Sequence, residues 1–376
     1  MAATDWLRRV VRCIASWSPG QRLVPLLGGV VASGGAGAVT LPEDKAEALF
    51  HTYHGGGVTA NGPALLVRKS IADKVSLQAS YYVDSVSNAS IDVITTASPF
   101  KEKRTAYDFA LDYVYRDALI SVTLGKSTEP DYKVDSFGLD VAQEVFGGMT
   151  TLSLGFTRSA DKVGQKGIGF FDTAHHWQYR AGVTQILSPR WLASANFEAV
   201  SDDGYLGSPY RVARVFGAAV PERSPRTRTS RAIKLRVIGD MGSRDAVRAE
   251  FRTFWDNWDV KATTLDFGYS RYFGERWLAD VFLRVRSQNK AVFYSDNATS
   301  ETLYISRNRQ LSSFRDVGLG TKLSWTLPRW REGVDLKLNG SLEFKRFDYS
   351  DFSDIRTGKP YTFDAGLMQV YVSATF

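Results

Sequence analysis

The final residues of the chain alternate without interruption between two kinds of side chain. Across residues 367–376, one set of alternate positions is apolar and the other is mostly polar. The first set includes Met368, Val370, Val372, Ala374 and Phe376, and the second includes Leu367, Gln369, Tyr371, Ser373 and Thr375. Successive side chains of a β-strand point to opposite faces, so this period of two predicts a strand. Such a strand fits either a soluble sandwich or the wall of a membrane barrel.

The same alternation recurs along most of the chain. It is clearest at residues 107–115, 247–255, 277–285 and 334–344, where one face is apolar and the other carries charges of both signs. After residue 38 there is no run of about 18 apolar residues, so the sequence predicts no helical membrane span there. The pattern therefore predicts an all-β fold.

Two further features favour a membrane barrel over a sandwich. Large aromatic residues lie near predicted strand ends, as an interfacial girdle requires, at Trp191, Trp255, Trp277, Trp325 and Phe376. Tight turns also alternate with connections that are mostly longer, at 87–104, 161–173, 203–229, 293–311 and 349–361, with three shorter ones at 55–61, 129–132 and 258–259. We therefore predict a transmembrane antiparallel β-barrel of about sixteen strands, with short periplasmic turns and long extracellular loops.

The sixteen predicted strands cover the chain evenly. They span residues 45–54, 62–71, 74–86, 105–116, 118–128, 133–145, 149–160, 174–187, 191–202, 230–239, 244–257, 260–273, 276–292, 312–327, 333–348 and 362–376. An even number of antiparallel strands returns both chain ends to the same side of the membrane. Closure into a cylinder also leaves no strand edge, and every backbone amide is then paired within the lipid.

The N-terminal segment predicts export. Four arginines within the first 22 residues precede an apolar stretch at 23–32, and residues 36–38 resemble an A-x-A cleavage site. We predict that residues 1–38 are a cleaved signal peptide and that residues 39–376 form one barrel domain in the outer membrane of a Gram-negative cell. The only cysteine, Cys13, lies in the signal, so no disulfide or thiolate chemistry is predicted for the mature domain.

The predicted inward faces carry many charges. They are Asp108, Asp112, Arg180, Glu198, Lys234, Arg236, Arg248, Glu250, Arg252, Asp266, Asp280, Arg284, Arg286, Lys322, Lys337, Glu343 and Lys345. One interpretation is a basic constriction that selects anionic solutes. The other is a ladder of cross-strand ion pairs that stiffens the interior. A sixteen-stranded barrel leaves a water channel unless a loop blocks it, and the basic loop at 221–231 could fold inward or contact lipopolysaccharide phosphates outside.

Other candidate sites are weaker. Asp84 and Asp92 could hold a cation near the loop at 87–104, but turn chemistry explains its Ser, Asn and Asp residues equally well. Of the four histidines, adjacent His175 and His176 point to opposite faces, which is poor geometry for one metal. His51 or His54 could join one of them, yet a structural role is the simpler interpretation. We predict no metal, no cofactor and no catalytic residue.

The block at residues 55–104 resembles a known family. Its pieces include Gly62-Pro63, residues 66–69, residues 81–84, residues 87–92 and residues 97–99. They are similar to the hallmark of an uncharacterised Gram-negative family, a conserved domain of unknown function whose members are taken to be outer-membrane barrels. This resemblance implies the same fold and location. The terminal Phe376 also resembles the signal that such barrels present to their assembly machinery, although Ala374 occupies the third-last position, where an aromatic is common.

These observations predict a passive, porin-like channel for small polar solutes with an anion preference. A structural barrel that docks a periplasmic or lipoprotein partner is the first alternative, and a barrel enzyme is the second. The expected partners are outer-membrane lipid, lipopolysaccharide and the barrel-assembly machinery. Without the signal, 43 basic and 39 acidic residues remain, and this small excess does not favour nucleic-acid binding.

Overall fold

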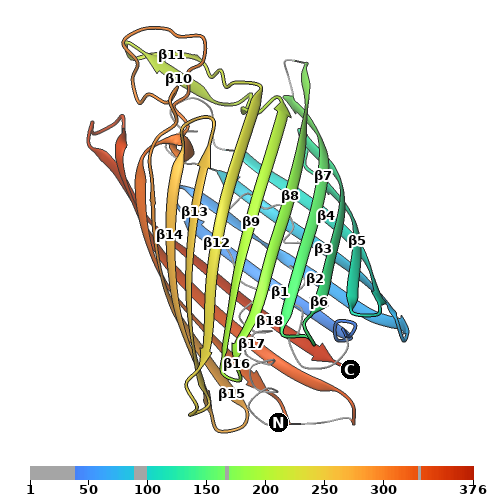
Figure 1. Ribbon diagram of the computed structural model, residues 1–376. Helices are drawn as coiled ribbons and strands as arrows, with labels where there is room; N and C mark the ends of the chain where they lie inside the picture. Colours follow the sequence, from blue (N-terminus) through green and yellow to red (C-terminus); the bar gives the residue numbers. More distant parts are fainter. Residues whose placement is uncertain (1–38, 89–99, 166–168, 329–331) are drawn as a thin grey trace.

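The computed structural model describes residues 39–88, 100–165, 169–328 and 332–376. Within these residues, sixteen antiparallel strands close into one barrel and two more form a small separate sheet (Figure 1). The predicted fold class, an antiparallel β-barrel of about sixteen strands, is therefore confirmed. The predicted signal peptide lies outside the described residues.

The strands follow the predicted ranges, with differences at their ends. Strand β2 begins at Val58 rather than at residue 62, because Gly56 and Gly57, both with positive φ, already reverse the chain. Strand β4 begins at Phe100 rather than at residue 105. The barrel strands are β1 (Lys45–Gly55), β2 (Val58–Ala72), β3 (Val75–Asn88), β4 (Phe100–Tyr115), β5 (Ala118–Thr128), β6 (Tyr132–Val145), β7 (Thr150–Gln165), β8 (Phe170–Ser188), β9 (Trp191–Gly204), β12 (Thr227–Asp240), β13 (Asp245–Asp256), β14 (Lys261–Phe273), β15 (Trp277–Gln288), β16 (Phe314–Thr326), β17 (Asp335–Ser353) and β18 (Pro360–Thr375).

The barrel closes where its first and last strands meet. Strand β1 pairs antiparallel with β18 along its whole length, so the sheet has no free edge. The backbone N–H of Phe376 donates to the Asp44 carbonyl oxygen at 3.2 Å. Hydrogen bonds from Lys69 and Ser70 to the Asp44 carboxylate lower the pKa of Asp44 to about 2. The Lys69 ammonium also lies over the Phe376 ring, 4.9 Å from its centroid, so the C-terminal residue is fixed at this seam.

The two ends of the barrel differ in their connections. At the end where β18 finishes, the hairpins are joined by tight turns, and we call this the turn end (bottom of Figure 1). At the opposite end, the loop end, β9 is joined to β12 through residues 205–226 and β15 to β16 through residues 289–313. Other connections at the loop end, such as that between β13 and β14, are short. This asymmetry agrees with the pattern expected of an outer-membrane barrel.

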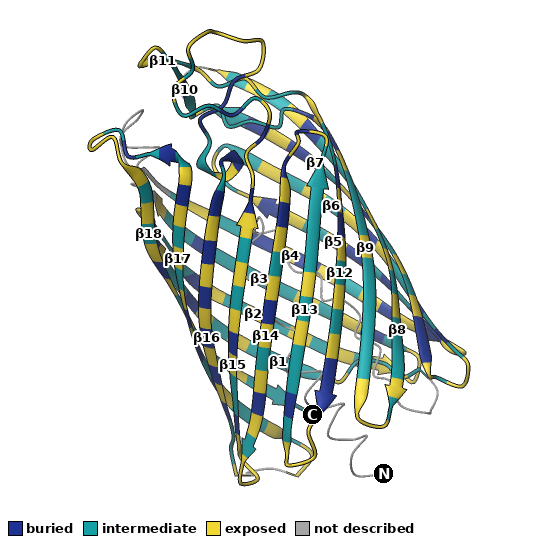
Figure 2. Ribbon diagram, turned by 60° about the vertical axis from the view of Figure 1, so that its left-hand side comes forward, coloured by how far each residue is buried: buried dark blue, intermediate teal, exposed yellow. Residues whose placement is uncertain are grey.

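The exterior of the barrel is apolar and its interior is polar. Along each strand, exposed and less exposed positions alternate (Figure 2). On β4, for example, Phe109 is 60% exposed while its neighbour Asp108 is only 8% exposed. This is the reverse of a water-soluble protein, in which large apolar side chains are covered. An exterior of this kind is stable when lipid tails cover it.

Aromatic residues mark the edge of the apolar exterior at the turn end. Trp277 begins β15, and Trp325 lies near the end of β16, directly opposite it in the sheet register. Their rings stack with centroids 5.5 Å apart. Trp191, at the start of β9, is also partly exposed there. Tryptophan favours the boundary between lipid and water because its ring is apolar and its N–H is polar.

The loop end carries a folded cap. The connection from β9 to β12 contains the hairpin β10 (Val212–Val215) and β11 (Ala218–Pro221), which lies above the barrel in Figure 1. Isolated β-bridges from Val215 to Ala298 and from Arg223 to Ile305 join this connection to the loop at 289–313. The Arg223 guanidinium also pairs with Glu301 at 2.7 Å. Two loops far apart in sequence are thus held together.

A buried aromatic core anchors this cap to the wall. Residues of the loops after β13 and β15 pack against inward side chains of β16 and β17, and the core comprises Trp258, Val260, Ala291, Tyr294, Leu311, Phe314, Tyr349 and Phe352. Arg307, 6% exposed, pairs with Asp296 at 2.7 Å, and its guanidinium lies over the Phe352 ring. The loop also contains a short 3-10 helix, Arg309–Leu311. No helix in the described parts of the chain is long and apolar enough to cross a membrane.

Candidate functional site: the charged inner wall

The predicted lumen charges lie on the inner face of the wall. On every strand concerned they occupy the less exposed set of alternating positions, while their apolar neighbours occupy the exposed set. This holds for Asp108, Asp112, Arg180, Glu198, Lys234, Arg236, Arg248, Glu250, Arg252, Asp266, Asp280, Arg284, Arg286, Lys322, Lys337, Glu343 and Lys345. Their partners across the sheet separate them into groups with different electrostatics.

The first group is a compact network of ion pairs, which we call the lower cluster: Arg248, Asp266, Arg284, Glu343 and Lys345. Asp266 on β14 accepts hydrogen bonds from Arg248 of β13 at 2.7 Å and from Arg284 of β15 at 2.8 Å. Glu343 on β17 lies 3.5 Å from Arg284 and 3.2 Å from Lys345. The side chains of Asp266 and Glu343 are 5% and 0% exposed. Each buried carboxylate therefore neutralises two cations at once, as the ion-pair ladder interpretation expects.

Glycines on intervening strands make room for these pairs. Gly318 lies between Arg284 and Lys345 in the register, and neighbouring Gly320 lies beside the Phe282 ring. A glycine has the same role on β7. There the Arg180 guanidinium of β8 extends across Gly155 and lies 2.8 Å from the Asp140 carboxylate of β6. A Cβ at position 155 would lie 2.2 Å from an Asp140 carboxylate oxygen. An ion pair between next-nearest strands needs such a gap in the strand between them.

The second group lies toward the loop end and consists of three cations and one threonine, which we call the upper row: Lys234, Arg252, Thr264 and Arg286. In the register, Lys234 of β12 faces Arg252 of β13, Arg252 faces Thr264 of β14, and Thr264 faces Arg286 of β15. The row itself contains no carboxylate. Flanking carboxylates lie at its two ends, with Glu198 3.6 Å from Arg252 and Asp316 next to Arg286 in the register.

In the upper row, Arg286 contacts neutral groups, whereas Arg252 lies near the Glu198 carboxylate. The Arg286 guanidinium donates to the Gln288 side-chain oxygen at 2.7 Å and lies over the Phe314 ring, 5.1 Å from its centroid. Lys234 makes no ion pair within 4 Å to another described residue. Three positive charges thus lie side by side across neighbouring strands, which is the arrangement that the constriction interpretation expects. The ion-pair interpretation thus describes the lower cluster, and the constriction interpretation stays a prediction for the upper row.

The remaining predicted charges make local contacts outside the lower cluster and the upper row. Asp112 accepts from Ser121 at 2.5 Å, and Asp108 accepts from Ser80 at 3.1 Å. Arg236 pairs with Glu250 at 2.6 Å. Asp280 accepts a hydrogen bond from Ser270, the Lys322 ammonium lies near the Tyr371 ring, and Lys337 is partly buried near the turn end.

Two inward histidines form pairs that sequence reasoning did not predict. His51 Nε2 lies 2.6 Å from Asp84 Oδ1 and 3.0 Å from the Tyr82 hydroxyl, and its ring stacks on that of Tyr82. Asp84 therefore faces the interior from β3. Asp92, the second residue of the candidate cation site with Asp84, lies outside the described residues.

The second histidine pair lies on the opposite part of the wall. His176 Nδ1 is 2.6 Å from Asp202, and its Nε2 is 3.0 Å from Asp161. With both ring nitrogens occupied by carboxylates, His176 has none left for a metal. His175 faces outward beside Trp177, and no group of three His, Cys, Asp or Glu residues in the described chain is arranged to hold a metal. Asp161 and Asp202 occupy inward positions in the period-two alternation of their strands, so this alternation could have predicted that both face the interior.

The basic loop at 221–231 makes specific ion pairs at the loop end. Arg223 pairs with Glu301 of the other cap loop. Arg226 forms a double hydrogen bond with Asp172 on β8, at 2.7 and 2.9 Å. Arg228 pairs with Asp256 at 2.5 Å and lies over the Trp258 ring. These arginines connect the cap to the rim of the barrel.

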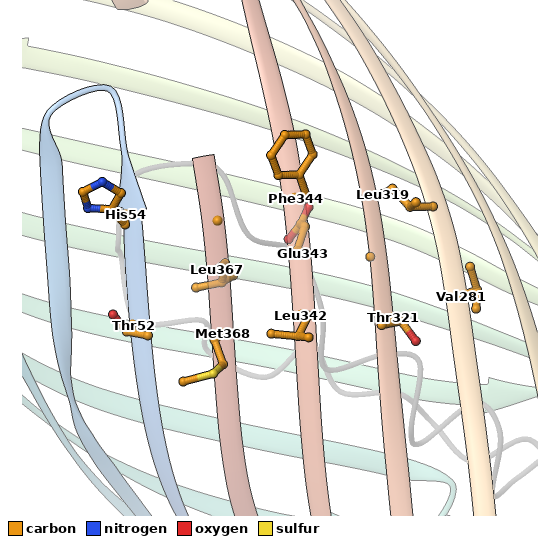
Figure 3. Close-up of a pocket in the computed structure, with 12 residues that line it drawn as sticks. Thr52, His54, Val281, Leu319, Thr321, Leu342, Glu343, Phe344, Leu367 and Met368 are labelled. Carbon is orange, nitrogen blue, oxygen red and sulfur yellow. The ribbon is translucent and has the colours of Figure 1, made fainter. Parts of the chain in front are cut away.

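A depression of about 460 Å³ lies on the outer face of the wall (Figure 3). Its lining includes outward side chains of Val281, Leu319, Leu342, Phe344 and Met368, which are 41–57% exposed. It adjoins Gly366, which contributes no side chain. Because this face is the apolar exterior, acyl chains would fill the depression, although Glu343 of the lower cluster also contributes to its lining.

The fold and the inner wall together define the class. A closed, even-stranded antiparallel barrel with an apolar exterior, a charged interior and unequal connections is an outer-membrane-type β-barrel. Residues 170–343 match the family described as a protein of unknown function (DUF3570). The resemblance to an uncharacterised barrel family is thereby confirmed, through residues that lie C-terminal to the block at 55–104.

Solved structures with similar folds include receptors, channels and secretins. The siderophore receptor PirA from Pseudomonas aeruginosa is 8% identical with a TM-score of 0.45, over 89% of this chain and 81% of that one. A bacterial polysaccharide outer membrane secretin is 7% identical with a TM-score of 0.49, over 89% and 100%. The CymD monoaromatic hydrocarbon channel is 9% identical with a TM-score of 0.41, over 89% of each chain. A comparison with curated protein sequences gives no match. Likenesses this distant carry no argument about activity.

Proposed function

We propose that this protein is a passive channel of the Gram-negative outer membrane for small polar solutes, with a preference for anions. The observation that carries this proposal is the upper row, in which Lys234, Arg252 and Arg286 face the interior from neighbouring strands around Thr264. A cluster of like charge in a narrow, low-dielectric passage concentrates ions of the opposite sign. Sixteen strands also enclose enough space for a water-filled path.

The orientation follows from the two ends of the barrel. We assign the turn end to the periplasm and the loop end to the outside, as in barrels with short periplasmic turns. A solute entering from outside would then pass the cap, the upper row and the lower cluster in that order. In this orientation Phe376, which is 44% exposed at the turn end, would lie on the periplasmic side, where we expect the assembly machinery. Export by residues 1–38 is part of the same proposal.

Reconstitution into planar bilayers tests the proposal. In a KCl gradient, we expect stepwise conductance and a reversal potential displaced toward the equilibrium potential of chloride. Protein denatured by heat before reconstitution is the control. If protein shown to be folded by its heat-modifiable mobility gives no conductance at any voltage, the channel proposal fails. The alternative of a docking barrel for a periplasmic or lipoprotein partner then takes its place.

Two matched double variants locate the selectivity. Arg252→Gln with Arg286→Gln removes two charges from the upper row, and Arg248→Gln with Arg284→Gln removes two from the lower cluster. We expect the first pair to reduce the chloride preference and the second to leave it largely unchanged. The second pair leaves Asp266 buried without its cations and should lower stability instead. Equal losses of selectivity in both variants would exclude the upper row as the selective element.

A further inference from the structure

The outer face of β5, β6 and β7 carries a group of basic side chains near the loop end. It comprises Lys126, Lys133, Arg158 and Lys162, which we call the outer basic patch. Lys133 and Lys162 face each other directly across β6 and β7. Lys133, Arg158 and Lys162 are exposed and have no hydrogen-bond or ion-pair partner among the described residues. Lys126, with its side chain 65% exposed, lies 3.7 Å from Asp135, the one outward carboxylate of these three strands near the patch.

The patch begins where the apolar exterior ends. On β7, the outward positions Leu152 and Leu154 are 47% and 67% exposed, and Arg158 and Lys162 follow on the same face toward the loop end. In the register, Arg158 lies between Phe137 and Trp177, aromatic residues of the kind that mark a lipid–water boundary. Lys162 is four residues further along the strand, roughly 13 Å at strand spacing. The patch therefore spans the depth at which lipid headgroups adjoin a barrel.

The opposite side of the barrel differs at the same end. On β17, Arg346 lies 3.4 Å from Asp348 and 3.6 Å from Asp364 of β18, so two carboxylates compensate one cation. On β5–β7, which are consecutive neighbours in the wall (Figure 1), four outward cations accompany one outward carboxylate, Asp135. A local excess on a lipid-adjacent face is suited to an anionic lipid rather than to a general solubilising role.

We propose that the outer basic patch binds the phosphorylated sugar headgroup of a glycolipid in the outer leaflet. Arg158, at the aromatic level, can donate two parallel hydrogen bonds to a phosphate, and Lys133 with Lys162 can hold a second phosphate nearer the loop end. The exposed Leu152 and Leu154 below them contact the acyl chains of the same lipid. This site is outside the barrel, so the inference depends on insertion in an outer membrane and not on conduction.

Native mass spectrometry of the folded barrel in nonionic detergent tests the site. The probes are bis-phosphorylated lipid A, enzymatically dephosphorylated lipid A and phosphatidylglycerol. The test variant carries Lys126→Gln, Lys133→Gln, Arg158→Gln and Lys162→Gln together. A control variant removes four outward cations elsewhere at the loop end, through Arg231→Gln, Lys261→Gln, Arg315→Gln and Arg346→Gln. Heat-modifiable mobility confirms that each variant is folded.

We expect the unaltered protein to prefer bis-phosphorylated lipid A over both other lipids. The test variant should bind it about tenfold more weakly, because each basic residue near an anionic headgroup contributes to binding. The control variant should bind as the unaltered protein does. Equal binding of dephosphorylated lipid A or phosphatidylglycerol by the unaltered protein, or equal losses in the two variants, would overturn the inference. Because conductance is not measured, failure here leaves the channel proposal intact.

Discussion

The lower cluster and the upper row share strands β13, β14 and β15, and on β14 and β15 they lie two residues apart, yet they balance their charges differently. In the lower cluster, Asp266 lies opposite Arg284 and diagonal to Arg248, and it neutralises both. In the upper row, the same strand places Thr264 between Arg252 and Arg286. One residue of β14 therefore decides whether two neighbouring arginines form a structural network or a cationic surface. Similar basic residues on one wall are thus paired with buried carboxylates in the lower cluster and lie beside a neutral residue in the upper row.

The largest expected effect is on the lower cluster. Asp266→Asn removes the counter-ion of two partly buried guanidiniums, which are 12% and 14% exposed. We expect the free energy of unfolding to fall by about 3–5 kcal/mol, because uncompensated buried charge is costly. Urea unfolding in lipid vesicles, followed by tryptophan fluorescence, measures this. The control, Asp135→Asn, removes an exposed ion pair and should cost at most about 1 kcal/mol. Equal costs would mean that the lower cluster is not a stabilising network.

A smaller effect is expected at Gly320, the glycine that gives space to the Phe282 ring beside the lower cluster. In Gly320→Ala, the new Cβ would lie 2.2 Å from the Phe282 ring, which must then move against Arg284. We expect a loss of about 1–3 kcal/mol, as for other overpacked sites. Gly340→Ala on β17 is the matched control, because nothing lies within 4 Å of a Cβ there. If the two variants unfold at the same urea concentration, the gap has no structural role.

One substitution should remove the difference in charge compensation between the lower cluster and the upper row. Thr264→Asp places a carboxylate between Arg252 and Arg286, as Asp266 lies between Arg248 and Arg284 in the lower cluster. A chloride that passes about 6 Å from the new carboxylate in water is raised in energy by about 0.7 kcal/mol, so we expect the chloride preference to fall about threefold. The reversal potential in a KCl gradient measures this. Thr264→Asn, which has the same shape without the charge, should keep the preference. A preference unchanged by Thr264→Asp would place the selective element elsewhere.

The smallest effect is expected from salt. Raising KCl from 0.1 M to 1 M shortens the screening length from about 10 Å to about 3 Å. Charges of the upper row then act over a shorter distance, so the chloride preference should decline. Ion pairs of the lower cluster are direct contacts at 2.7–3.5 Å between largely buried groups, which salt screens much less, so they should keep the barrel stable. Selectivity that rises with salt would contradict a surface-charge origin.

Much of this molecule is predictable from local sequence alone. Period-two alternation over residues 107–115 and 277–285 establishes strands and their two faces, because a strand has only two sides. The inward position of every predicted lumen charge follows from the same geometry. Sixteen strands with alternating turns and loops then lead to a closed barrel. The inward Asp161 and Asp202 were also within reach of this reasoning, since each continues the period of its strand.

Tertiary structure alone decides which inward charges meet. Asp266 reaches Arg248 and Arg284, and His176 bridges Asp161 and Asp202, because the register between strands places them opposite or diagonal to one another. Register depends on turn geometry and on long-range closure of the sheet, neither of which the alternation of a single strand encodes. The bridges between the loops at 205–226 and 289–313 have the same origin. The sequence by itself determined which side chains face inward, and the assembled barrel decided which of them neutralise one another, since a side chain's direction is local and its neighbour is not.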